Sequence, residues 1–355
     1  MTVDATPSEA QRIRRISPWR TFLTRPEFGS IIGAVFIFTL FWALTGFTVG
    51  KGFMSWQGFA AYIEVTAQVG ILGATVSLLM IAGEFDLSVG SMVGAAGLIL
   101  AMCVSTYGLP VGLGLLITFA FALAIGWING YLVVRTGLPS FIVTLGTLYM
   151  LRGAGLALTR MATNGLTIVS GVNTSTAGDP LAWLFNGTII SIGGGDFKTE
   201  LVWWIVVVLV STWVLLRTRF GNWIFAVGGN KDASRSMGVP VSRVKILLFM
   251  ATALSAAIFA CIQVLSFGTA DVLRGTGKEF EAIITAVIGG TLLTGGYGSA
   301  LGSAFGAFVL GVTQLGIYFV PGFNSDWYAF VLGLLLLVAA MLNNWILRRA
   351  SGARS

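Results

Sequence analysis

Two ionisable residues, Glu64 and Arg152, stand inside long apolar stretches of the sequence. If those stretches cross a membrane, ionisable groups within them are costly to bury, and such groups usually serve a function or pair with each other. Glu64 and Arg152 could therefore form a proton-coupling site. A structural pair, or a glutamate facing a wet cavity, explains the same two residues equally well.

Residues that commonly perform metal or nucleophilic chemistry are scarce. The sequence has no histidine, and its two cysteines, Cys103 and Cys261, lie far apart within apolar stretches. Metal sites, disulfides and cysteine–histidine catalysis therefore lose support. The segment 275–278, Gly-Thr-Gly-Lys, is similar to a phosphate-binding loop, but that motif needs a glycine where Val272 stands and a Ser or Thr where Glu279 stands. We expect no catalytic residue, no metal site and no nucleotide or other cofactor in this chain.

The segment 83–90, Gly-Glu-Phe-Asp-Leu-Ser-Val-Gly, places two acids just before a predicted helix. Asp86 or Ser88 suits the N-cap, because a side-chain oxygen at that position accepts hydrogen bonds from the free amides of the first turn. We expect this structural role. A functional role would require the segment to face a partner or the path of a solute.

A second polar segment, 228–240, has the spacing of a short helix. Asn230 can cap a helix over 232–237, and Gly238 can end it. Ala233 and Ser234 are predicted to face outward between charged flanks, which suits docking into a groove of a partner protein. An ordinary solvated loop is the alternative.

Neutral amides and a charged outer segment complete the candidates. Amide side chains can both donate to and accept from a hydroxyl group, and those within predicted spans are Gln68, Asn129, Gln263 and Gln314. We expect one or two of them to face a passage for an uncharged solute and the others to bond between helices. Mixed charge that could steer a soluble partner lies at Asp271, Arg274, Lys278, Glu279 and Glu281.

Composition indicates the surroundings that these residues need. Of 355 residues, 56% are hydrophobic and 10% are charged, whereas soluble domains carry about 25% charged residues. The apolar runs are long enough, as helices, to cross a hydrocarbon layer about 30 Å thick. We predict an all-α polytopic membrane protein with about ten transmembrane helices; nine or eleven remain possible because the eighth is short. The predicted spans are 29–47, 59–81, 87–106, 111–134, 140–159, 201–216, 244–266, 282–293, 300–320 and 327–347.

Basic residues indicate the orientation of the spans. The net charge of +7 is concentrated at the ends of apolar runs, which favours membrane lipid over nucleic acid as its partner. The positive-inside rule places both termini in the cytoplasm. The few basic residues on the opposite side are Lys51, Arg160, Lys198, Arg274 and Lys278. The predicted organisation is a cytoplasmic segment at 1–27, a transmembrane domain at 28–347 with an outer loop at 160–200 and an inner loop at 217–243, and a cytoplasmic tail at 348–355.

Several motifs resemble the permease subunits of ribose-type ABC sugar importers, such as ribose, xylose and fructose permeases. They are Gly-Glu-Phe-Asp-Leu-Ser-Val-Gly-Ser at 83–91, Asn-Gly at 129–130 followed by Pro-Ser-Phe-Ile-Val-Thr-Leu-Gly-Thr at 139–147 and Arg-Gly at 152–153, and Ala-Val-Gly-Gly-Asn at 226–230. The resemblance runs through nearly all the spans. It implies a ten-helix permease of the bacterial inner membrane that forms a homodimer, sits on two cytoplasmic ATP-binding subunits, and receives sugar from a periplasmic sugar-binding protein.

The resemblance also gives the inner loop a role. The run Asp232-Ala233-Ser234-x-x-x-Gly238 is similar to the Glu-Ala-Ala-x-x-x-Gly coupling loop of importers, with conservative replacements at its first and third positions. The usual Leu-Pro ending downstream is missing. This similarity implies that Asn230 and those four residues couple the permease to the ATPase, and that the charged outer segment and the loop at 160–200 face the periplasm.

We therefore expect the permease subunit of an ATP-driven importer for a monosaccharide or similar polyol, with ATP bound on a separate subunit. Two alternatives stay open at this point. A secondary transporter could use Glu64 and Arg152 for proton coupling. A membrane-embedded enzyme is the weaker alternative, because the sequence lacks histidine, paired catalytic carboxylates and a metal cluster.

Overall fold

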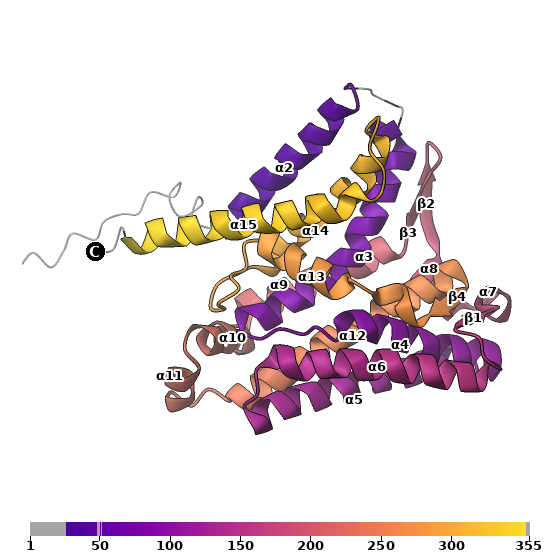
Figure 1. Cartoon of the computed structure of the whole chain (residues 1–355), viewed down its shortest axis with the longest axis horizontal. Helices are drawn as coiled ribbons and strands as arrows, with labels where there is room; N and C mark the ends of the chain where they lie inside the picture. The colour runs from indigo at the N-terminus through magenta and orange to yellow at the C-terminus, as the bar shows by residue number, and fades with distance from the viewer. Residues whose placement is uncertain (1–25, 48–49, 51, 353–355) are drawn as a thin grey trace, which may run out of the picture.

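The computed structural model describes residues 26–47, 50 and 52–352, with side chains described up to residue 344, and it is built almost entirely of helices (Figure 1). Nine helices in this part are long and apolar enough to cross a membrane, which confirms the prediction of an all-α polytopic membrane protein. They are α2 (Pro26–Leu44), α3 (Trp56–Ile81), α4 (Val89–Ala101) with its π-helical continuation η2 (Met102–Thr106), α5 (Val111–Thr136), α6 (Ser140–Ala162), α9 (Glu200–Arg217), α12 (Val241–Phe267), α14 (Ala300–Phe319) and α15 (Trp327–Gly352). The segment predicted at 1–27 lies, except for its last two residues, outside the described residues.

The eighth predicted span, 282–293, is not a complete crossing. In its place lies α13 (Lys278–Ile288), whose 11 residues form a helix of about 16 Å, roughly half the thickness of a hydrocarbon layer. It ends at Gly289 and Gly290, and Gly290 has a φ of 88° that favours glycine. The preceding residues 268–277 are not α-helical and lead the chain inward from the end of α12.

Short elements gather at the two ends of the bundle (Figure 1). One end carries β1 (Ile168–Ser170), α7 (Val172–Ser175), α8 (Pro180–Asn186), β2 (Thr188–Ile192), β3 (Gly195–Lys198), β4 (Thr269–Asp271) and the 3-10 helix η1 (Gly52–Met54). The 3-10 helix η3 (Val272–Gly275) follows β4 and lies deeper in the bundle, against α4. Antiparallel pairing joins β1 to β4, with Val169 opposite Ala270, and β2 to β3. The opposite end carries α10 (Arg219–Gly229) and α11 (Lys231–Ser236). We call these the outer end and the inner end, following the predicted orientation.

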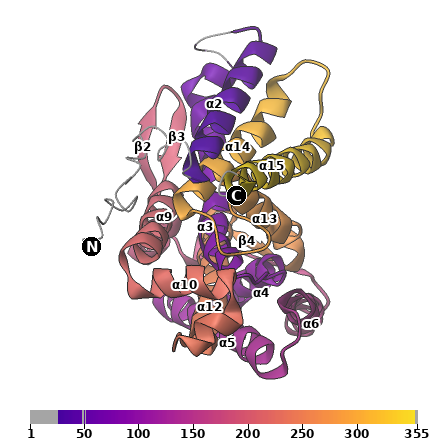
Figure 2. The ribbon, with the colours of Figure 1, turned by 90° about the vertical axis from the view of Figure 1, so that its left-hand side faces the viewer.

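Figure 2 looks along the bundle from its inner end and shows α3 near the centre, α4 and α12 below it, α2 at the top, and α6 and α15 to the right. Burial follows this arrangement: 78% of the apolar window of α3 lies inside the protein, against none of that of α15. The central helices therefore hold the core, and their side chains determine which polar groups can be tolerated there.

Two units of similar order interlock in this core. In each unit a long helix, a break, a shorter helix and another long helix follow one another, as α3, α4 and α5 or as α12, α13 and α14. The units run in opposite directions, since α3 ends at the inner end and α12 at the outer end. Glycines let them pack closely: a Cβ on Gly126 of α5 would lie 2.6 Å from the Phe249 oxygen of α12, and a Cβ on Gly311 of α14 would lie 2.6 Å from the Tyr62 oxygen of α3. Inverted repeats with broken helices are common in transporters.

Candidate functional site

The chain between α3 and α4, residues 82–88, leaves the helical conformation inside the bundle; we call it the inner break. Backbone groups there lose the partners that a helix provides, and hydrocarbon offers no replacement. The amide of Phe85 donates to the Ser140 hydroxyl, and the amide of Leu87 donates to the Thr144 hydroxyl, both at 3.0 Å. The first turns of α6 therefore stabilise the inner break.

Asp86 lies at the centre of a buried hydrogen-bond network and is 1% exposed. Its carboxylate accepts from the Ser88 amide (2.9 Å), the Ser88 hydroxyl (2.5 Å) and Thr252, near the middle of α12 (2.7 Å). Asn129 donates to the Ser88 hydroxyl (3.0 Å) and accepts from Thr147 (2.6 Å). Asp86 thus binds the start of α4, whereas Ser88 makes no capping bond. The Asn129 amide is used between helices.

Residues 268–277, which we call the outer break, fold back against α4. Gly268, with a φ of 70°, ends α12, and β4 then pairs with β1. The following helix η3 touches the small residues of α4: a Cβ on Gly94 would overlap the Val272 oxygen, and a Cβ on Gly90 would lie 2.5 Å from the Gly275 oxygen. The two breaks therefore meet at the first turns of α4.

This folding corrects one expectation for the charged outer segment. Glu279 is only 4% exposed and lies beside Gly90, so it is not available to a soluble partner. The other charges of the segment also make intramolecular contacts. Lys278 pairs with Glu281 (2.6 Å), Asp271 accepts from the Leu273 amide (2.9 Å), and Arg274 donates to the Thr269 oxygen (2.7 Å) while lying over the Phe267 ring.

A chain of polar side chains joins α3, α9 and α12 near the outer end. Glu64 forms an ion pair with Lys198 of β3 (2.8 Å). One turn further along α3, Gln68 donates to Glu200 (2.9 Å) and accepts from Gln263 (2.8 Å). Two of the amides predicted as candidates for a passage therefore bond to each other across helices.

The partner of Glu64 differs from the one that the sequence suggested. Glu64 bonds Lys198 and not Arg152. Arg152, on α6, instead lies close enough to Glu279 for its charge to stabilise that carboxylate. Of the four candidate amides, Gln314 on α14 is the one whose carbonyl oxygen is buried without a hydrogen-bond partner among the described residues.

At the inner end, a buried ion pair and a polar pocket lie beside α10. Glu84, in the inner break, pairs with Lys245 in the first turns of α12. A pocket of about 350 Å³ opens next to this pair. Its lining comes from the inner break, the α5–α6 loop, the end of α10 and the α13–α14 loop, and includes Gly83, Glu84, Leu138, Pro139, Gly228, Asn230, Lys231, Lys245 and Thr294.

The short inner helix has the form that its sequence predicts. Asn230 caps α11 by accepting from the amides of Asp232 (3.1 Å) and Ala233 (2.9 Å), and Gly238 follows it with a φ of 81°. Asp232 and Ala233 are exposed. Ser234 was expected to face outward, but it is 1% exposed because its hydroxyl turns back to the Asn230 carbonyl (2.7 Å).

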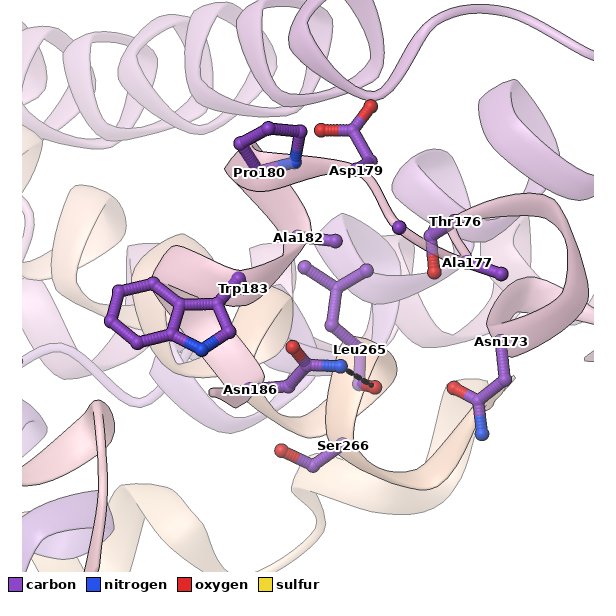
Figure 3. Close-up of a pocket in the computed structure, with 11 residues that line it drawn as sticks. Asn173, Thr176, Ala177, Asp179, Pro180, Ala182, Trp183, Asn186, Leu265 and Ser266 are labelled. Carbon is purple, nitrogen blue, oxygen red and sulfur yellow. Dashed lines mark hydrogen bonds between the residues drawn. The ribbon is translucent and has the colours of Figure 1, made fainter. Parts of the chain in front are cut away.

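At the outer end, α7, α8 and the last turn of α12 enclose a second pocket, of about 390 Å³ (Figure 3). Its lining combines amides and hydroxyls with one indole and one carboxylate, and it includes Asn173, Thr176, Asp179, Trp183, Asn186 and Ser266. Asn186 donates to the Leu265 oxygen (2.9 Å), which leaves its own carbonyl oxygen free to accept. No basic side chain lines this pocket.

Sequence reasoning missed the partners in these networks. Lys198 and Glu200 flank the start of the sixth predicted span, and Lys245 begins the seventh. A charge at the end of a span was therefore a visible signal, but the acid or amide that it meets lies far away in the sequence. Ser140 and Thr144 lie in the motif at 139–147, which indicated a family but no hydrogen-bond partner, and Thr252 carried no local signal.

Comparison with known proteins places the chain among transport proteins. The model of the family described as "branched-chain amino acid transport system / permease component" matches residues 58–340. A probable ABC transporter permease protein, y4mJ of Sinorhizobium fredii, is 33% identical over 93% of this chain and 91% of its own length. The fructose import permease protein FrcC of Rhizobium meliloti is 31% identical over 86% of the chain and 83% of its own length, and the ribose import permease protein RbsC of Escherichia coli is 30% identical over 84% and 88%. No solved structure matches at a comparable level of significance.

The Glu64–Lys198 pair should be structural. Burial lowers the pKa of Lys198, but the Glu64 carboxylate and the charges of Glu200 and Asp196 outweigh that effect and raise it overall. Each partner is 29% exposed, so a double-mutant cycle of Glu64→Gln and Lys198→Met should give a coupling of about 0.2–1 kcal/mol in thermal unfolding. Because the pKa of Lys198 is higher in the folded protein than in the unfolded chain, the ion pair stabilises the fold fully at pH values below the unfolded lysine pKa of about 10.4. The coupling should fade as the pH rises through the folded pKa of Lys198.

The control for this cycle is Glu64→Gln with Arg152→Gln. These two changes should be additive, because Arg152 does not contact Glu64. Coupling of Glu64 to Arg152, with none to Lys198, would contradict the assignment.

Proposed function

This chain belongs to the branched-chain amino acid transport permease family of ABC transporters, and we propose that it conducts a monosaccharide or similar polyol across the bacterial inner membrane. It is a transport subunit and not an enzyme, and permeases of this kind act with an ATPase and a substrate-binding protein. Two relatives are named as fructose and ribose import permeases, which favours a sugar over the amino acid in the family description.

The observation that carries the proposal is helix α11. It lies between the sixth and seventh spans, at the end of the bundle where the basic residues gather, and its Asp232, Ala233 and Arg235 are exposed. Asn230 and Gly238 fix both ends of this helix, so its exposed face is rigid enough to fit a groove. We propose that α11 docks on the ATPase, which holds the ATP.

A neutral solute fits the charges of the described spans. A passage for an anion would need basic groups free to offset the loss of hydration. The lysines nearest the core are already committed, Lys198 to Glu64 and Lys245 to Glu84, and the charge of Arg152 acts on the Glu279 carboxylate. The outer pocket instead offers amides, hydroxyls and the indole of Trp183, a combination that suits the hydroxyls and apolar face of a sugar.

The broken helices suit a cycle of alternating access. Closure of the two ATPase subunits would bring the α11 helices of two permease copies together and shift the inner end relative to the outer end, so that solute delivered by a periplasmic binding protein is released inside. We propose a homodimer for this assembly, surrounded by lipid. The proton-coupled alternative loses its basis, because the family is ATP-linked and Glu64 and Arg152 are not partners.

The first test concerns Gly238. Its φ of 81° with open space around it means that valine there strains the backbone without creating a clash. Gly238→Val should leave the amount of protein in the membrane unchanged and lower ATP-driven uptake about tenfold by displacing the end of α11. Gly322→Val is the matched control, because Gly322 has a φ of 84° and equal space in an outer loop. Normal uptake in Gly238→Val would count against docking by α11.

The second test concerns the charge of the solute. Uptake of neutral pentoses and hexoses should exceed uptake of uronic acids of equal size at least about 100-fold, because desolvating an unpaired charge costs several kcal/mol. Gln314→Leu should slow neutral uptake, because its carbonyl oxygen has no hydrogen-bond partner among the described residues. Gln68→Leu, Asn129→Leu and Gln263→Leu should act mainly through stability, because their amides bond between helices. Efficient transport of the acid, or wild-type uptake in all four variants, would overturn this assignment.

A further inference from the structure

Three backbone segments meet at the inner end with almost no side chain between them: 81–83, 228–229 and 295–296. We call this contact the glycine junction. The Gly296 amide donates to the Ile81 carbonyl oxygen (2.8 Å). A Cβ on Gly228 would overlap that same oxygen and lie 2.6 Å from the Gly296 nitrogen. A Cβ on Gly295 would lie 2.9 Å from the Gly83 Cα.

Such contacts make the glycine junction stiff. Side chains between two helices can change rotamer and absorb a displacement, but backbone atoms in direct contact cannot. Gly295 and Gly296 also have φ values of 81° and 75°, which other residues rarely adopt. The three segments therefore move together or separate completely.

On one side the glycine junction connects to α11 through a single residue. Gly228 lies in the last turn of α10, and Asn230 is the link between α10 and α11. The Asn230 amide donates to the Ala226 oxygen (3.0 Å), and its side chain accepts from the Ala233 amide (2.9 Å). Asn230 is thus bound to both helices, so a displacement of α11 must reach Gly228.

On the other side the glycine junction touches both interlocking units. Segment 81–83 ends α3 and begins the inner break, where Glu84 is tied to Lys245 of α12. Segment 295–296 lies in the loop between α13 and α14. One contact therefore links α10 to the broken helices of each unit.

We propose that the glycine junction passes the displacement of α11 to both broken helices at once, with Gly228 as the positioning residue of the relay. This inference rests on the proposed docking of α11 on an ATPase. It extends that role to residues which do not touch the ATPase and whose effect is confined to coupling.

The test compares two neighbouring glycines in vesicles that contain the permease, its ATPase and its binding protein. Gly228→Ala places a methyl group into the glycine junction, whereas a Cβ on Gly229 has nothing within 4 Å. The readout is the amount of solute taken up per ATP hydrolysed, counting only the hydrolysis that solute-loaded binding protein stimulates, because that part requires folded permease. Gly228→Ala should lower this ratio about tenfold, within the range of allosteric coupling, and Gly229→Ala should keep it. A wild-type ratio in Gly228→Ala, or an equal loss in Gly229→Ala, would overturn the relay.

A second measurement does not depend on the folding of Gly228→Ala. Spin labels can be placed at the exposed positions Met237 after α11, Leu293 in the α13–α14 loop and Leu166 at the outer end. When ATP binds, the distance from Met237 to Leu293 should stay constant, and the distance from Met237 to Leu166 should change. If the distance from Met237 to Leu293 changes more than the distance from Met237 to Leu166, the glycine junction does not move as one body.

The two variants Gly238→Val and Gly228→Ala distinguish failure of the proposed function from failure of the relay. If α11 does not dock at all, Gly238→Val keeps normal uptake. If α11 docks but the relay is wrong, Gly238→Val lowers uptake and Gly228→Ala does not.

Discussion

The constraint on which this structure depends is the lack of hydrogen-bond partners for backbone groups in hydrocarbon. Two segments leave the helical conformation inside the bundle, and each must find partners within the protein. The inner break finds them in the hydroxyls of Ser140 and Thr144 and in the Asp86 carboxylate. The outer break finds them by pairing β4 with β1, in the Asp271 carboxylate, which accepts from the Leu273 amide, and in Arg274, which donates to the Thr269 oxygen. The elements around the two breaks therefore supply the hydrogen-bond partners that the breaks need.

A broken helix is costly to stabilise, but it gives the bundle a place to bend that a continuous helix lacks. The breaks lie at the first turns of α4 and just before α13, and the units that contain them run in opposite directions. A shift at the inner end can therefore change access there while the outer end rearranges separately. The outer pocket and the polar chain from Glu64 to Gln263 belong to one end, and α11 and the glycine junction belong to the other.

Features with a local cause could be predicted from the sequence. The spans followed from apolar run length, and α11 followed from the capping spacing of Asn230 and Gly238. A short eighth helix was predicted at 282–293, but the start of α13 at Lys278 was not, because the charges of Lys278, Glu279 and Glu281 are typical of a loop. The Glu64–Lys198 pair, the burial of Glu279 and the inward turn of Ser234 depend on residues distant in sequence. No periodicity or motif specifies those contacts.

The measurement that tests this account most directly is the energy source of uptake. Vesicles that contain the permease, its ATPase and its binding protein should accumulate neutral sugar when ATP is present at the ATPase, whether or not a proton gradient exists. A proton ionophore should leave that accumulation unchanged, and removal of the ATPase should abolish it. Uptake that persists without the ATPase and collapses with the proton gradient would contradict the account.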